Sequence, residues 1–301
     1  MTTPMTGGPR PAPTDAPAGT NASVTGSDER SAAAPARLPG PIRVGLSRGW
    51  LEVREFVREW ESVVFTFTLP SLVLLLFGVI FDGAFDAGMP AVDFYLPGLI
   101  AMGLMSVSFQ TLGTGIAVER ERGGLRRLRG TPMPPTAYFL GKTVLVLVLA
   151  LAQLVLLLGV AVLVYDAAMP RDTTAWSVLA WVFLLGTVAG ALLGTAVSSL
   201  ARNARTAAGI VVVPFLVLQF ISGIFVPVAL LPGWLLNAAS LFPLKWMAQG
   251  MRAAFYPDEF SAAEPSGAWD LHLVALALGV WCVVGLLLAL TTFRWKTRKD
   301  G

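Results

Sequence analysis

Residues 143–165 read TVLVLVLALAQLVLLLGVAVLVY, a continuous apolar stretch without a single Asp, Glu, Lys or Arg. A helix of about 20 apolar residues crosses the roughly 30 Å hydrocarbon core of a bilayer, because each residue advances it by about 1.5 Å. We therefore expect this stretch to span a membrane.

Five further stretches have the same character, in a chain that is 55% hydrophobic and 14% charged, with mean hydropathy +0.68. The composition is far from that of a soluble domain. The sequence predicts an all-α polytopic membrane protein with six transmembrane helices. They are expected at 63–81, 94–117, 143–165, 175–197, 206–226 and 271–293.

None of the six stretches contains Asp, Glu, Lys or Arg. Ion-driven pumps and transporters usually keep an ionisable residue at membrane depth. A transporter without one takes its energy from elsewhere, and a separate partner that hydrolyses ATP is the obvious candidate.

No set of residues suited to catalysis is visible. The chain has one cysteine, Cys282, and one histidine, His272, so neither a disulfide nor a metal site is expected. Gly141-Lys142-Thr143 resembles the end of a phosphate-binding loop but lacks the upstream glycine and the strand context. We expect no enzyme activity and no cofactor bound by this chain. The net charge of +3 does not favour a nucleic-acid partner.

The first 43 residues are rich in Pro, Ala, Thr and Gly and are expected to form a disordered cytoplasmic tail ahead of a permease domain at 44–299. Between 44 and 61, apolar residues recur at helical spacing. This pattern predicts a helix lying in the membrane interface, with charged residues such as Glu52 on its polar side. The alternative is a helix packed on a soluble partner. The apolar stripe comprises Leu46, Trp50, Val53, Val57 and Trp60.

Basic residues are distributed unevenly between the two sets of connecting segments. Sixteen lie in the flanks and loops on the side of the N-terminus, against Arg171, Lys245 and Arg252 on the other side. Because basic loops stay in the cytoplasm, both termini are expected inside a bacterial cytoplasmic membrane.

The longest internal cytoplasmic connection is VERERGGLRRLRGTPMPP, residues 118–135. Gly123 and Gly124 should end one helix, and a second short helix should present Leu125 and Leu128 within a ring of arginines. This arrangement suits docking on an acidic groove of another protein, and attraction to anionic lipid is the alternative. We call this exposed segment the handle. The residues assigned to it are Glu119, Arg120, Glu121, Arg122, Gly123, Leu125, Arg126, Leu128 and Arg129.

The outer segment 227–267 is too apolar for an ordinary loop, and Pro232 and Pro243 divide it into pieces too short to cross a bilayer. We expect short re-entrant helices held by Trp234 and Trp246, which could form an outer gate.

Polar side chains within the spans allow two interpretations. Glutamines at membrane depth usually hydrogen-bond between helices. Alternatively, they line a path for an amphipathic molecule together with adaptable Met and Phe side chains. The residues of that path are Met102, Met105, Phe109, Gln110 and Gln219. Gly186, Gly190 and Gly194, at four-residue intervals, predict a close packing seam.

The six-span layout, the interfacial helix, the 118–135 loop and the segment LPGWLLNAASLFPLKWMAQGMR at 231–252 together resemble the type-2 ABC transporter permeases. Within these they are similar to the bacterial drug-exporter branch associated with daunorubicin and polyketide resistance. The resemblance covers about 44–299. It includes the proline-centred pattern at Pro243, followed by Arg252, although Phe242 stands where relatives often have Asn.

The resemblance implies a pair of six-span units, identical or homologous, working with two cytoplasmic ABC ATPase subunits that bind ATP and Mg. The handle would then be the coupling helix, and Trp234, Pro243, Trp246 and Arg252 would belong to the outer gate. The expected function is export of hydrophobic or amphipathic small molecules. Alternatives are export of a lipid or lipid-linked glycan, an intramembrane lipid-modifying enzyme and a passive assembly factor.

Overall fold

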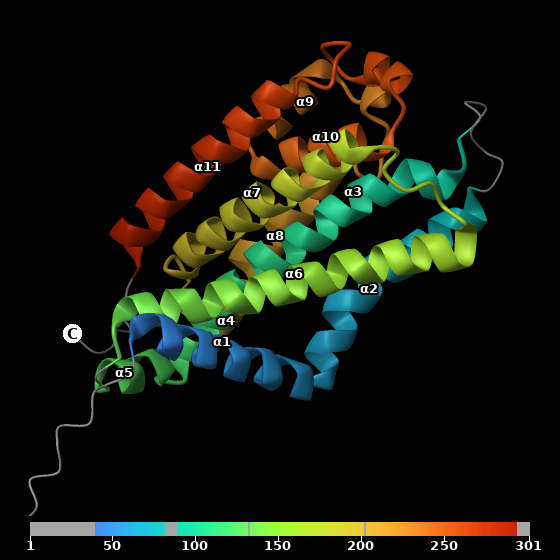
Figure 1. The fold of residues 1–301 in the computed structure, drawn as a ribbon. Helices are drawn as coiled ribbons and strands as arrows, with labels where there is room; N and C mark the ends of the chain where they lie inside the picture. The colour runs from blue at the N-terminus through green and yellow to red at the C-terminus, as the bar shows by residue number, and fades with distance from the viewer. Residues whose placement is uncertain (1–39, 82–88, 132, 202, 294–301) are drawn as a thin grey trace, which may run out of the picture. The chain divides into compact units, whose positions relative to one another are not determined.

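The computed structural model describes residues 40–81, 89–131, 133–201 and 203–293, and all regular elements in these ranges are helices (Figure 1). Six of them are long and apolar enough to cross a membrane, so the predicted all-α polytopic fold is confirmed. Residues 1–39 of the predicted tail lie outside the described residues. The six are α2 (Trp60–Ile80), the continuous rod α3–η1–α4 (Ala91–Glu121), α6 (Pro135–Tyr165), α7 (Thr173–Ser198), α8 (Ala204–Ile221) and α11 (Leu271–Thr292).

The remaining elements lie toward the two ends of these helices. Figure 1 shows α1 and α5 at one end, called the α5 end below, and α9 at the other, called the α9 end. Their bounds are α1 (Pro41–Arg58), α5 (Gly124–Arg129), η2 (Val228–Leu230), α9 (Gly233–Ala239), α10 (Pro243–Phe255) and η3 (Asp258–Ala263).

Three spans differ from the sequence-based expectation by several residues at one end. The rod α3–η1–α4 continues to Glu121 rather than ending at 117. Helix α6 begins at Pro135 rather than at 143, because consecutive prolines at 134 and 135 favour a helix start, and this places Lys142 inside the helix. Helix α8 ends at Ile221 rather than at 226, and Gly223 follows with φ +74°.

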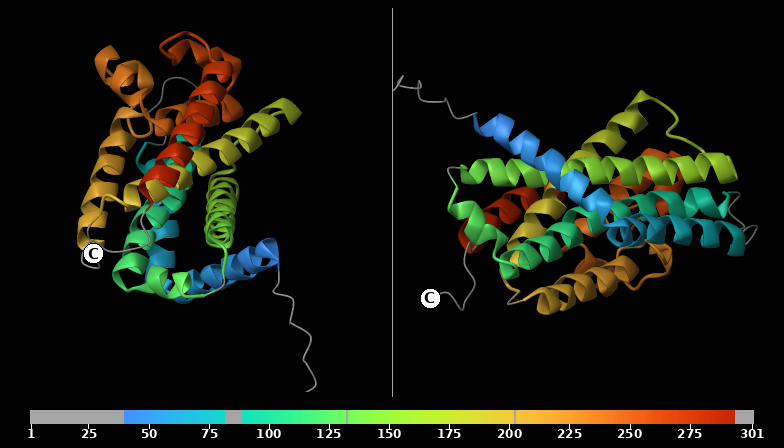
Figure 2. Two further views of the ribbon diagram at one scale, coloured as in Figure 1. Left: turned by 90° about the vertical axis from the view of Figure 1, so that its left-hand side faces the viewer. Right: turned by 90° about the horizontal axis from the view of Figure 1, so that it is seen from below.

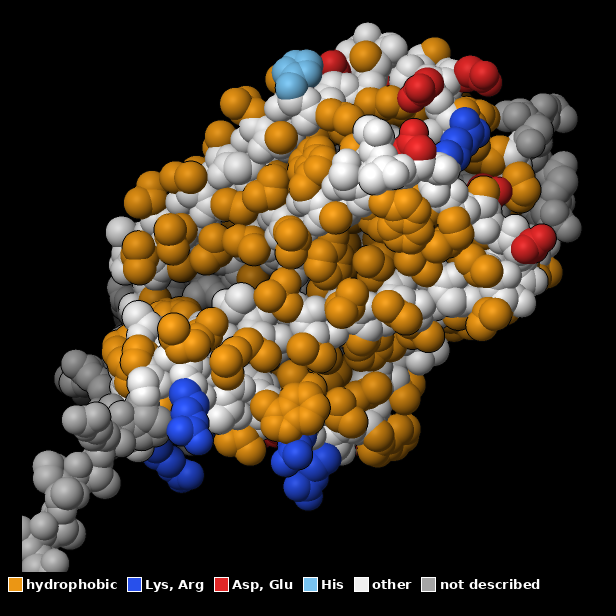
Figure 3. All heavy atoms as spheres, viewed as in Figure 1, with side chains coloured by type: hydrophobic (Ala, Val, Ile, Leu, Met, Phe, Trp, Pro, Cys, Tyr) orange, Lys and Arg blue, Asp and Glu red, His pale blue; other side chains and the backbone are white. Residues whose placement is uncertain are grey.

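The core is built around α3, whose residues are almost all buried and which contacts α2, α6, α7 and α10. In contrast, α2, α8 and α11 expose large apolar side chains, for example Phe65, Val213 and Leu290. The space-filling view shows a broad apolar surface, with basic side chains near the α5 end and acidic ones toward the α9 end (Figure 3). Such a surface is typical of a protein surrounded by lipid.

Helix α1 crosses α6 at short range (Figure 2, right). Its buried positions are Gly45, Gly49, Glu52 and Val53, so Val53 of the predicted apolar stripe faces the bundle, whereas Leu46, Trp50 and Val57 are exposed. The interfacial placement of α1 stays a prediction. The expectation that Glu52 lies on the polar outer side is wrong, because the two glycines turn that side of α1 toward α6. Trp60 belongs to α2.

The rod formed by α3 and α4 contains a wide π-helical turn, η1 (Ser106–Gln110). Ser108 donates a hydrogen bond to the Leu104 carbonyl at 2.7 Å, and Thr114 donates to the Gln110 carbonyl at 2.7 Å. One of these carbonyls lies just before the wide turn and the other belongs to its last residue, where the regular helical bonding pattern changes.

The predicted glycine seam of α7 is confirmed as a packing surface within the chain. A Cβ on Gly190 would lie 2.2 Å from the Ser108 hydroxyl oxygen, and one on Gly194 would lie 2.5 Å from the Phe109 carbonyl oxygen. Only glycine therefore lets α7 approach η1 this closely.

Replacing Gly194 by Ala should lower stability by about 1–3 kcal/mol, because the added methyl group collides with main-chain atoms that cannot move aside. Thermal unfolding of the purified protein in detergent measures the effect. Gly159→Ala is the matched control, since a Cβ there meets nothing within 4 Å. Equal melting temperatures for the two variants would contradict the seam.

Candidate functional site at the α5 end

The predicted handle divides at Gly123, which has φ +75° and separates α4 from α5. Glycine adopts this left-handed conformation without strain. Helix α4 continues to Glu121, so Glu119, Arg120 and Glu121 belong to the transmembrane rod.

All three residues are bonded to the helix bundle. Glu119 accepts hydrogen bonds from Lys142 and from the Tyr138 hydroxyl, the latter at 2.8 Å. Arg120 is buried and donates to the Ser198 carbonyl at 2.8 Å. Glu121 accepts a bond from the Ala204 main-chain N–H at 2.7 Å, at the start of α8. These residues therefore fasten α4 to α6, α7 and α8.

The expectation that Leu125 is an exposed apolar anchor is wrong. Its side chain is fully buried in a cluster with Leu112, Ile116, Tyr138 and Val146 of α4 and α6. A buried leucine on so short a helix ties α5 to its own chain. Leu128 packs partly against the same cluster.

The surface that α5 leaves exposed is basic. Arg126 and Arg127 are exposed, as is Arg122 at the end of α4, and the Arg129 side chain lies outside the described part of the chain. Docking of α5 on another protein stays a prediction. The side chains that α5 exposes for it are arginines rather than leucines.

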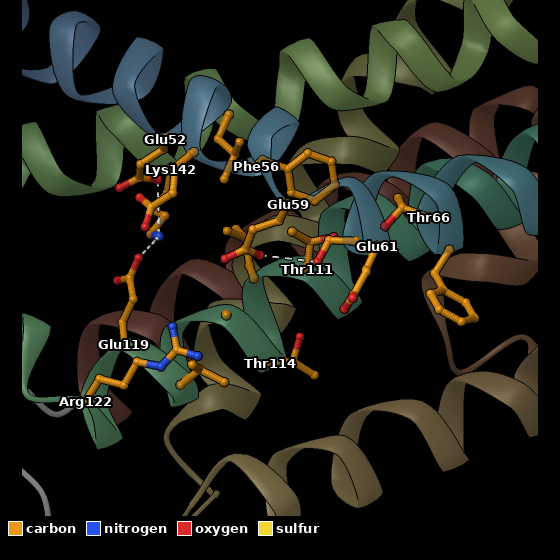
Figure 4. Close-up of a pocket in the computed structure, with 17 residues that line it drawn as sticks. Glu52, Phe56, Glu59, Glu61, Thr66, Thr111, Thr114, Glu119, Arg122 and Lys142 are labelled. Carbon is orange, nitrogen blue, oxygen red and sulfur yellow. Dashed lines mark hydrogen bonds and ion pairs between the residues drawn. The ribbon is translucent and has the colours of Figure 1, made fainter.

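An acidic hollow of about 580 Å³ lies beside this segment, between α1, the start of α2, and α4 (Figure 4). Five glutamates line it, against the cations of Arg122 and Lys142. Phe56 and Phe65 add apolar surface. The glutamates are Glu52, Glu55, Glu59, Glu61 and Glu119.

Lys142 lies in the wall of this hollow between Glu52 and Glu119 (Figure 4). Its ammonium nitrogen is 3.1 Å from Glu52 Oε2 and also bonds Glu119 Oε1. Arg48 Nη2 is 2.9 Å from Glu52 Oε1. Burial raises the pKa of Glu52, and the neighbouring Lys142 and Arg48 partly offset this increase.

Sequence reasoning missed Glu52 and Lys142 as partners. The hydropathy pattern puts Lys142 just outside the span 143–165, and the helical pattern puts Glu52 on the polar side of α1. The spacing of Gly45, Gly49 and Glu52 on one helical face was the available signal, because small residues mark the side on which helices approach.

The residues predicted to line a substrate path lie mostly inside the chain. Met102, Met105 and Phe109 are buried in the main core, Gln219 is buried on α8, and Gln110 is half-exposed. The three core residues therefore face neighbouring helices, and the path stays a prediction.

At the α9 end, α10 is buried against α3, α7 and α11. Its Arg252 forms a buried ion pair with Glu264 at 2.7 Å, and Lys245 donates to Gln249 at 2.6 Å. Burial lowers the pKa of Lys245. Sequence reasoning missed Glu264, which nothing in the local pattern distinguishes.

The residues assigned to an outer gate have different surroundings. Pro243 begins α10 and is buried, and Trp246 donates from its indole N–H to the Ser240 carbonyl at 2.8 Å. Trp234 on α9 is exposed, so it does not hold α9 against the core of this chain. Their gating role stays a prediction.

Six apolar helices, with the buried α10 between α8 and α11 in the chain, define a polytopic membrane protein. Residues 45–256 match the ABC-2 type transporter family, and the chain belongs to that family.

Two relatives are similar to this chain over more than half of its length. The daunorubicin resistance ABC transporter permease protein DrrB1 of Streptomyces coeruleorubidus is 29% identical over 252 residues, or 80% of this chain and 82% of that protein. The probable multidrug ABC transporter permease YbhR of Escherichia coli K12 is 25% identical over 190 residues, or 62% of this chain and 50% of that protein.

Replacing Arg252 by Met should cost about 3–5 kcal/mol of stability, because Glu264 is then buried without its cation. The double variant Arg252→Met/Glu264→Gln should recover much of the loss. Thermal unfolding in detergent compares them, with the exposed Arg171→Met as control. Equal stability of the single and double variants would argue against a paired charge.

Proposed function

We propose that this chain is the membrane-spanning subunit of an ATP-driven exporter that moves hydrophobic or amphipathic small molecules out of a bacterial cell. The membership of residues 45–256 in the ABC-2 family carries the proposal. The names of the relatives, a daunorubicin resistance permease and a probable multidrug permease, favour drug-like molecules as cargo.

In this proposal a separate cytoplasmic ABC ATPase supplies the energy and docks at the α5 end. The exposed Arg126 and Arg127 support that position, because a basic helix is complementary to an acidic cleft and steers association. The basic side chains near α1 and the acidic ones toward α9 support a cytoplasmic α5 end in the bacterial inner membrane (Figure 3).

The apolar surfaces of α2 and α8 support a second six-span subunit as partner. Val64, Phe65 and Leu69 on α2 and Val213, Leu216 and Val217 on α8 are all exposed. Such surface is covered either by lipid or by a second copy of the chain.

The test reconstitutes the chain with an ABC ATPase that co-purifies with it and measures ATP-dependent accumulation of daunorubicin in inverted vesicles. We expect accumulation with ATP and none with a non-hydrolysable analogue. Transport of a fluorescent phospholipid in place of the drug would contradict a small-molecule cargo.

Reversing the charge of α5 with Arg126→Glu/Arg127→Glu should weaken ATPase association roughly tenfold or more, because two cations become repulsive toward an acidic cleft. Co-purification at several salt concentrations measures it, and Arg171→Glu is the matched control at the α9 end. Unchanged association would exclude α5 as the docking helix.

A further inference from the structure

Four charged side chains at the α5 end join three helices into one ionic cluster. Arg48 and Glu52 come from α1, Glu119 from α4 and Lys142 from α6. Two carboxylates face two cations, so the cluster is neutral as a unit.

Lys142 is the centre of this cluster. Its side chain is only 7% exposed, and its ammonium group bonds carboxylates from two other helices. It also lies 5.5 Å from the centre of the Tyr138 ring, and the hydroxyl of Tyr138 donates to the second oxygen of Glu119. Charge-assisted bonds are shorter and stronger than neutral ones, and here they hold the largely buried Lys142 between the two carboxylates.

The position of Glu119 connects the cluster to α5. Glu119 lies in the last turn of α4, directly before Gly123 and α5. The start of α5 also lies against Glu119, because a Cβ on Gly124 would be 3.2 Å from the Glu119 carbonyl oxygen. A displacement of α5 therefore reaches Glu119, in addition to the α4 and α6 side chains that surround Leu125. The bond from Glu119 to Lys142 transmits this displacement to α6, which crosses the whole bundle as one helix (Figure 1).

We propose that Lys142 is a coupling pivot, a positioning residue that transmits the movement of α5 through Glu119 to α6 and, through Glu52, to α1. The inference rests on the proposed function, because the ATPase supplies the movement of α5. Lys142 touches neither ATP nor the cargo in this role.

A suitable variant distinguishes a residue that transmits movement from one that only stabilises the fold. Removing one partner of a buried ion pair destabilises a protein, whereas replacing both partners by neutral side chains of similar size is often nearly neutral. The variant Glu119→Gln/Lys142→Met removes one carboxylate and one cation, and it leaves Arg48 paired with Glu52.

The experiment uses the reconstituted complex of the chain with its ATPase and measures daunorubicin transport and ATP hydrolysis in the same vesicles. We compare the wild type with Lys142→Met, Lys142→Arg, the double variant and the exposed control Arg171→Met. Assembly is followed by size-exclusion chromatography.

For the double variant we expect normal assembly and basal ATP hydrolysis, with transport per ATP lowered roughly tenfold or more, a range typical of coupling between sites. Lys142→Arg should keep most of the transport, because arginine retains the charge and can bond both carboxylates. Lys142→Met should lose transport in the same way, in whatever fraction assembles.

Normal transport per ATP in the double variant would overturn the pivot, even if Lys142→Met alone failed to assemble. A parallel loss of assembly and of both activities in the double variant would also overturn it, since that pattern describes a stabilising residue. Failure of the wild-type complex to transport would count instead against the proposed function.

Discussion

The structure depends on one constraint of the bilayer, which is that the middle of the helices and their ends have to be held by different interactions. A bilayer interior offers no hydrogen-bond partner, so every peptide group there must be bonded within its own helix, and charged side chains are costly. Among the described residues, the buried ion pairs accordingly lie at two levels. Arg48, Glu52, Glu119 and Lys142 lie at the α5 end, and Arg252 and Glu264 lie at the α9 end.

Between these two levels the helices are held together by close packing. The glycines of α7 admit η1, and those of α1 admit α6, at distances that no other residue allows. Because apolar side chains gain little by leaving lipid for protein, close packing has to supply the attraction between helices. The fold thus combines small residues along its length with charge pairs at its ends.

The sequence predicted the six spans well because hydropathy is a local property, and a run such as 143–165 admits only one interpretation. It could not predict which charges meet. Glu52 and Lys142 are far apart in the chain, and their pairing follows from the crossing of α1 over α6. Leu125 was misassigned for a related reason, since a leucine on a short basic helix looks the same whether it faces a partner or its own core.

The π-helical turn at η1 changes what the second span can do. A turn with one residue more than usual rotates everything beyond it around the rod axis, so α3 and α4 present separately phased surfaces on a single continuous helix. The α3 part of the rod packs mainly on α10, α2 and α6, whereas the α4 part packs on α7 and α8. One continuous helix in this way meets two different sets of neighbours.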